Sequence, residues 1–211
     1  MAAQNPEKLK ELVDLFDSEA RRNHVYPLEP KREGQPLITS DRTSFVYYGG
    51  MRRIAAASAP RLAGRRHVIS ADLEIPAAGA SGVVIAQGGR YGGFTLYVKD
   101  NHLTYETNAN GHSTGKLAST LSLPPGKVHV TLEFVPDETG SAPPTGPAPV
   151  FSGTATLSID GKPAGTGHIS ALGFGGEGLD IGSDLGSPVT PSYEGPFAFS
   201  GTVDTVTVDL K

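Results

Sequence analysis

The sequence contains no cysteine and no tryptophan among its 211 residues. Without cysteine the chain has no disulfide, no thiolate metal site and no cysteine nucleophile. Without tryptophan it lacks the largest aromatic side chain for stacking on a sugar ring. A basic balance is also missing, because the formal net charge is −4. We therefore expect neither nucleic acid nor a membrane as a partner.

Long hydrophobic runs are absent as well, and no apolar stretch approaches the length of a membrane span. The N-terminal stretch MAAQNPEKLKEL does not show the basic-then-apolar pattern of a signal peptide. Because nothing in this stretch directs secretion, the sequence predicts the cytoplasm as the default compartment.

What the chain has in quantity is turn residues, with 27 glycines and 17 prolines, as expected for many short strands joined by tight turns. The central segment is 82–107. In 94–99, Phe94, Leu96 and Val98 alternate with Thr95, Tyr97 and Lys99, which predicts a half-buried strand. The pair Asp100-Asn101 favours a two-residue hairpin turn into a second strand, 102–107.

Further strand signals occur along the chain, and Asp160-Gly161 marks a second hairpin. No internal repeat of fixed period accompanies them. The chain is therefore predicted to be mainly β, an antiparallel β-sandwich of the jelly-roll type with at least nine strands. The strands named by these signals are 45–48, 68–75, 83–86, 94–99, 102–107, 128–135, 154–159, 162–168, 179–181 and 202–210.

One N-terminal α-helix is predicted over residues 5–22, with Asn5 as its N-cap and Pro6 in the first turn. A single apolar stripe runs along it and requires a partner surface. The stripe consists of Leu9, Leu12, Val13, Phe16 and Ala20. We expect two regions: a helix with a proline-containing connector over 1–44, and the sandwich over 45–211. A polar loop is expected over 137–149.

The glycine cluster 88–93 resembles a phosphate-binding loop, but a strand follows it where such a loop requires a helix. A tight link between two strands is the better interpretation. The six histidines show no pair at metal-binding spacing.

Carboxylates offer two hypotheses. Asp72 and Glu74 share a strand face, as a glycosidase would require, but the alternating three-acid pattern is missing and exposed charges are the simpler interpretation. Glu177, Asp180 and Asp184 lie in a glycine-rich segment whose oxygens suit calcium. The alternative is that these side chains accept hydrogen bonds from their own backbone turns.

A carbohydrate surface is a further hypothesis. Arg90, Tyr91, Tyr97 and Tyr105 surround the central hairpin, where the arginine could contact a sulfate group and the tyrosines could stack on sugars. This would make the chain a lectin-like module, with sulfated glycans among its ligands. The alternative is that the tyrosines only cover the sheet.

Several segments together resemble the C-terminal region of bacterial arylsulfatases. They are NPEKLKELVDLFDSEARRNHVYPL, FVYYGGMRRI, GVVIAQGGRYGGFTLYVKDNHLTYETN, LSIDGKPAGTGHI, EGLDIGSDLGSPV and PFAFSGTVDTVTVDL. The sandwich is also similar to concanavalin-like and laminin-G-like domains, through the IDGK hairpin and the closing FSGTVDTVTVD strand.

The resemblance does not bring catalytic residues with it. Sulfatases convert a cysteine or serine in the pattern [C/S]-x-P-x-R, and in the nearest match, Ser58-Ala59-Pro60-Arg61, the arginine comes one residue early. The resemblance therefore implies a non-catalytic accessory domain that stabilises a sulfatase catalytic domain, shapes its active site or mediates subunit contacts. Without that partner we expect self-association through an exposed apolar patch.

Overall fold

The computed structural model describes residues 4–26, 41–137, 150–172 and 177–211. It divides the chain into two compact units, Met1–Pro36 and Leu37–Lys211. Most of the predicted connector and of the predicted loop over 137–149 lies outside the described residues. The proposed boundary between residues 44 and 45 stays a prediction.

The predicted N-terminal helix is confirmed as α1, Pro6–Arg22. Asn5 occupies the N-cap position, Pro6 lies in the first turn, and basic residues occupy the last turn, as the helix dipole favours. Within this unit four of the five stripe residues are about half exposed, and Ala20 is buried. The exposed fractions are 47% for Leu9, 51% for Leu12, 55% for Val13 and 56% for Phe16. The docking expected of this stripe stays a prediction. No helix in the described ranges is long and apolar enough to cross a membrane.

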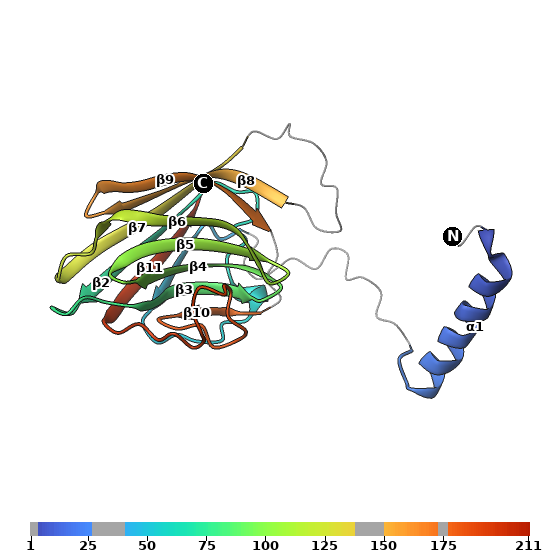
Figure 1. Ribbon diagram of the computed structural model, residues 1–211. Coiled ribbons are helices and arrows are strands. Elements are labelled where there is room, and N and C mark those ends of the chain that lie inside the picture. The colour runs from blue at the N-terminus through green and yellow to red at the C-terminus, as the bar shows by residue number, and fades with distance from the viewer. Residues whose placement is uncertain (1–3, 27–40, 138–149, 173–176) are drawn as a thin grey trace. The chain divides into compact units, whose positions relative to one another are not determined.

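The second unit is a sandwich of two antiparallel sheets, which confirms the predicted jelly-roll class (Figure 1). Sheet A has the order β1-β11-β2-β7-β8-β9, and sheet B has the order β10-β3-β4-β5-β6. The strands are β1 Ser44–Tyr48, β2 His67–Ile75, β3 Gly82–Gly89, β4 Gly92–Lys99, β5 His102–Ala109, β6 His112–Ser122, β7 Gly126–Pro136, β8 Val150–Ile159, β9 Lys162–Leu172, β10 Leu179–Ile181 and β11 Thr202–Leu210.

Both predicted hairpin turns form. Asp100 and Asn101, between β4 and β5, have φ angles of 50° and 63°. Asp160 and Gly161, between β8 and β9, have φ angles of 48° and 73°. Two consecutive positive φ angles match the right-handed twist of the flanking strands, and aspartate, asparagine and glycine tolerate them best.

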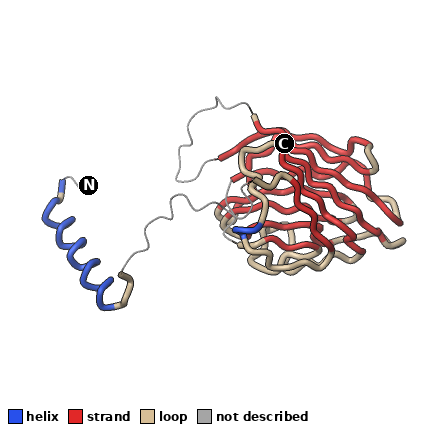
Figure 2. Tube along the Cα trace, turned by 180° about the vertical axis from the view of Figure 1, so that it is seen from behind, coloured by secondary structure: helices blue, strands red, loops and turns tan. Residues whose placement is uncertain are grey.

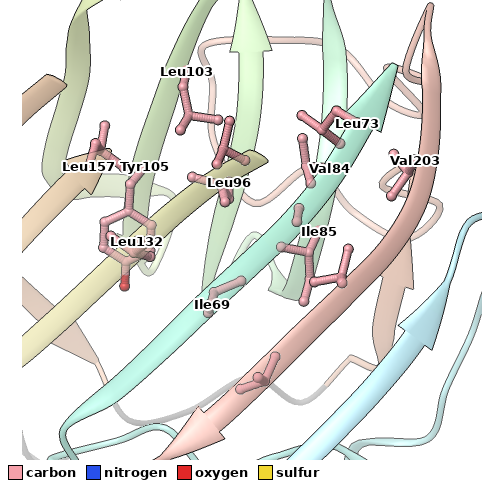
Figure 3. Packing of buried hydrophobic residues seen from close by; sticks show 14 of the residues in the cluster. Ile69, Leu73, Val84, Ile85, Leu96, Leu103, Tyr105, Leu132, Leu157 and Val203 are labelled. Atoms are coloured by element: carbon pink, nitrogen blue, oxygen red, sulfur yellow. The ribbon is translucent and has the colours of Figure 1, made fainter. Parts of the chain in front are cut away.

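The core lies between the sheets, where inward-facing side chains of both interdigitate (Figure 3). Ile69 in β2, Leu96 in β4 and Leu132 in β7 are each 0% exposed. The predicted alternation is confirmed on β7, whose residues are buried at every second position through its middle.

Two strand predictions need correction. The strand β4 is buried on both faces, because the segment 182–201 crosses the outer face of sheet B and places Val189 and Tyr193 against Tyr97. The strand β6 was not predicted, since most of its side chains are small or polar and it lies exposed at the edge of sheet B. The alanine-rich segment 51–64 contains a short 3-10 helix, Ala56–Ser58, among the loops in Figure 2.

Candidate functional site

A cavity of about 470 Å³ opens at one end of β3. Three segments form it, and backbone hydrogen bonds hold them together. Ile54 and Leu179 exchange bonds of 3.0 and 2.8 Å, and the Gly88 amide donates to the Gly178 carbonyl at 3.0 Å. The lining residues are Arg53, Ala55, Ala56, Gly88, Glu177, Gly178, Asp180, Leu185 and Gly186.

Asp180 is fixed by amides from both sides of the cavity. Its Oδ1 accepts from the Arg53 amide at 2.6 Å, and its Oδ2 accepts from the Leu185 amide at 3.0 Å. Arg53 precedes Asp180 by 127 residues, so this bond joins distant parts of the chain. The carboxylate is 8% exposed and cannot change rotamer without leaving both amides unpaired.

Glu177 is held by Ser187. The Ser187 amide donates to Glu177 Oε2 at 2.9 Å, and the Ser187 hydroxyl donates to Oε1. The same hydroxyl oxygen accepts from the Arg90 amide at 2.8 Å, which connects this carboxylate to the turn between β3 and β4. Glycine is needed beside it, because a Cβ at Gly186 would lie 1.7 Å from Glu177 Oε2.

Asp184 lies behind these two carboxylates and is 1% exposed. Its Oδ2 accepts from the Val189 amide at 2.9 Å and from the Tyr193 hydroxyl at 2.7 Å. Burial raises the pKa of Asp184, and the nearby charges of Asp180 and Glu177 raise it further. The three predicted acidic residues are therefore close in space.

Glu177, Asp180 and Asp184 are the three acids predicted as calcium ligands. Within the described residues, no group of three histidine, aspartate or glutamate side chains is placed to hold a metal ion. The oxygens of all three acids instead accept hydrogen bonds from nearby backbone amides and hydroxyls. Leu185, Ser187 and Val189 donate from the same stretch of chain, whereas Arg53 donates to Asp180 from a distant one. A calcium site at these three acids stays a prediction.

The four residues predicted for carbohydrate binding do not form one surface. Arg90 and Tyr91 are the exposed turn between β3 and β4, and Tyr91 is 75% exposed. Tyr105 is 2% exposed within the core, and Tyr97 is 0% exposed on the opposite face of the sheet. Since a sugar ring cannot reach buried rings, a platform that includes Tyr97 and Tyr105 is excluded, and only Arg90 and Tyr91 remain as candidates.

Under the segment 182–201 lies a buried polar network that the sequence did not reveal. Glu106 is 1% exposed, and its Oε2 accepts from the Tyr97 hydroxyl at 2.9 Å and lies 3.5 Å from Lys116 Nζ. Burial opposes its ionisation, but hydrogen bonds from the Thr190, Ser113 and Ser192 side chains outweigh this and lower the pKa of Glu106. A glutamate at an outward position of a strand normally indicates that this face is exposed to solvent. The burial of Glu106 becomes evident only from the segment that covers the sheet.

Asp72 and Glu74 are exposed on the outer face of sheet A, away from the cavity. Asp72 Oδ1 lies 2.8 Å from His129 Nδ1, and Asp72 Oδ2 accepts from the Thr205 hydroxyl at 2.9 Å. The hydrogen bond to His129 lowers the pKa of Asp72. This carboxylate is thus poised to stay ionised, and a role as catalytic acid receives no support.

No family model matches the chain, and no curated protein does either. Solved structures with a similar arrangement include a SAP-like pentraxin from Limulus polyphemus, with 16% identity, a TM-score of 0.39, and coverage of 81% of this chain and 75% of that chain.

A galectin from Caenorhabditis elegans has 10% identity and a TM-score of 0.41, with coverage of 78% of this chain and 95% of the galectin chain. Domains LG4-5 of the mouse laminin α1 chain have 12% identity and a TM-score of 0.40, with coverage of 80% and 39%. None of these three is a sulfatase, and the resemblance to arylsulfatases finds no support in them. Likeness at this level carries no argument about function.

Proposed function

We propose that this chain is a non-catalytic carbohydrate-binding module whose site is the cavity at the end of β3. The observation that carries the proposal is the combination of a polar cavity with an exposed aromatic ring at the same end of the strand. The cavity presents Glu177, Asp180 and Arg53, and the ring is that of Tyr91. A sugar offers hydroxyls, which both donate and accept hydrogen bonds, and an apolar face of C–H groups.

The cavity supports this proposal because its polar groups are already ordered. The Asp180 and Glu177 carboxylates are each fixed by two hydrogen bonds. Each ionised carboxylate has about four acceptor positions, so each retains about two for a ligand. Binding therefore costs little side-chain entropy, which is the main advantage of a preorganised site.

Tyr91 supports the proposal because most of this residue is exposed to solvent and not packed against the fold. The ring is 75% exposed at the tip of a two-residue turn, where smaller polar residues are usual. An exposed aromatic side chain on a loop beside a polar cavity is typical of a binding site.

A glycan array with neutral, amino-substituted and sulfated oligosaccharides tests the proposal. We expect the chain to bind a subset, and Ala55→Phe, which fills the cavity, to abolish that binding. Ala57→Phe is the matched control, since Ala57 is exposed in the same segment but does not line the cavity. Tyr91→Ala is expected to weaken binding by about two- to tenfold, the size of one lost aromatic contact.

A loss of binding on the array has to be distinguished from a loss of folding. Thermal melts of all variants establish that Ala55→Phe acts on binding and not on stability. If the wild-type chain binds no oligosaccharide, or if Ala55→Phe binds as well as Ala57→Phe, the proposal is wrong.

A second candidate is the accessory domain of an arylsulfatase-like enzyme. It is favoured by the α1 stripe, of which Leu9, Leu12, Val13 and Phe16 are about half exposed within their own unit. Packing of these side chains against a catalytic domain would stabilise the helix. We expect the chain to raise the melting temperature of an arylsulfatase catalytic domain lacking its own C-terminal region. Leu12→Asp should abolish this effect, whereas Leu15→Asp, off the stripe, should retain it. Sulfate-ester hydrolysis by this chain alone would contradict the candidate.

A further inference from the structure

We infer that the cavity binds uncharged or amino sugars and discriminates against sulfated and carboxylated ones. This inference rests on the proposed function and names the ligand class of the same site. It departs from the sequence-based expectation of sulfated glycans, because the structure shows which polar groups the cavity presents.

The first step is the charge of the lining. Glu177 and Asp180 contribute two carboxylates, and Arg53 is the one cation among the described residues that line the cavity. Asp184 adds a third acidic group behind them, close enough for the other two to hinder its ionisation. An anionic ligand would therefore enter a region of net negative charge, whereas an ammonium group would be attracted.

The second step is the hydrogen-bonding inventory. Sulfate accepts hydrogen bonds and donates none, so a site for it needs free N–H or O–H groups. The amides of Arg53, Leu185 and Ser187 already donate to Asp180 and Glu177. What remains on the carboxylates is acceptor capacity. Hydroxyl and ammonium groups donate to such acceptors, and a sulfate oxygen cannot. The guanidinium of Arg53 is a donor that a sulfate could use, but it lines the cavity beside two carboxylates, which repel an anion.

The third step concerns Arg90, a cation in the turn between β3 and β4 next to the cavity. Its backbone amide donates to Ser187, but its side chain extends toward the turn between β5 and β6. A Cβ built at Gly111 in that turn would lie 3.6 Å from Arg90 Nε. Arg90 is not among the residues that line the cavity. Its guanidinium therefore does not offset the two carboxylates.

The decisive experiment uses the same sugar backbone in three charge states. Glucosamine and galactosamine hexasaccharides are placed on the array with free amines, N-acetylated and N-sulfated, beside the panel already described. We expect affinity to fall in that order, and every binder in the panel to be uncharged or amino-substituted. If the best ligands are sulfated or carboxylated, this inference is wrong while the proposed function stands. If nothing binds, the proposed function fails first.

A charge variant gives an independent measurement. In Glu177→Gln the side-chain amide can donate to the Ser187 hydroxyl oxygen, so the local fold is retained. We expect the affinity for N-sulfated probes to rise about two- to fivefold relative to N-acetylated ones, the effect of one partly exposed charge. Glu194→Gln makes the same charge change at an exposed position outside the cavity and should leave the ratio unchanged. An equal shift in both variants would contradict the inference.

Discussion

The outer faces of the two sheets differ in what covers them. On sheet A, Tyr48 is 60% exposed, and the Asp72–His129 pair lies at the surface. On sheet B, the segment 182–201 crosses the outer face, and Tyr97 and Glu106 at equivalent outward positions are 0% and 1% exposed. The strands of both sheets are antiparallel. The difference shows that alternation along a strand specifies two faces, and not which of them meets water.

The covered face also carries the cavity. Asp180 pairs with Ala86 on the outer face of sheet B, and the covering segment supplies Leu185, Gly186 and Ser187 around it. The segment therefore has two effects. It buries polar side chains that the open face leaves in solvent, and it builds one wall of the proposed binding site.

The largest expected effect separates the two faces directly. Tyr97→Ala should destabilise the fold by about 3–5 kcal/mol, because it removes a fully buried ring and leaves a cavity under the covering segment. Tyr48→Ala, an identical change on the open face, should cost within about 0.5 kcal/mol. Urea unfolding measures both. Similar losses for the two variants would show that the segment does not cover sheet B in solution.

Asp184 should give the next largest effect. Asp184→Ala leaves the Val189 amide without its acceptor and leaves the Tyr193 hydroxyl only the longer bond to Thr95 Oγ1, at 3.1 Å. This should cost about 2–3 kcal/mol. Asp184→Asn keeps an acceptor and removes a charge that burial disfavours, so we expect it to be at least as stable as the wild type at neutral pH. Urea midpoints at pH 7 compare the two. An asparagine variant as unstable as the alanine variant would contradict this assignment.

His67 extends the comparison to the core between the sheets. It is 3% exposed and stacks on Phe134 at 5.2 Å, and burial lowers its pKa below the usual 6.5. The unfolded chain therefore binds a proton more readily than the folded one, and stability falls as the pH drops below 6.5 toward the folded pKa. His67→Gln should flatten this part of the stability–pH curve, as urea midpoints from pH 7 to pH 5 would show. An unchanged slope would contradict it.

The smallest expected effect concerns Asp72 on the open face of sheet A. Its contribution to the pH dependence of stability has the opposite sign to that of Asp184. The pKa of Asp72 is lowered in the folded state, so its contribution is present above 3.8 and is lost as the pH falls below that value. The pKa of Asp184 is raised, so its contribution to stability is lost as the pH rises above 3.8. Asp72→Asn should weaken the loss of stability in acid, and Asp184→Asn should strengthen it, in pH-dependent melts. Shifts of the same sign in both would contradict the assignment.

Part of the site could be predicted from sequence, and part could not. Glu177, Asp180 and Asp184 lie close together, as their positions in one short glycine-rich segment predict. The sequence does not predict that Glu177 and Asp180 line a cavity, since the amide that fixes Asp180 comes from Arg53, 127 residues earlier. Tyr97 and Tyr105 are predicted to stack on sugars because they surround the central hairpin. The covering segment buries Tyr97, and the opposite sheet buries Tyr105.

The sequence by itself determined the local structure of this protein. Asp100-Asn101 and Asp160-Gly161 set the hairpins because few residues tolerate two positive φ angles, and the N-terminal helix follows from Asn5, Pro6 and an apolar stripe. Only the tertiary structure decided which outward side chains are buried and which polar groups meet. Those outcomes depend on where a segment with no regular period, 182–201, packs, and contacts between residues distant along the chain leave no local pattern.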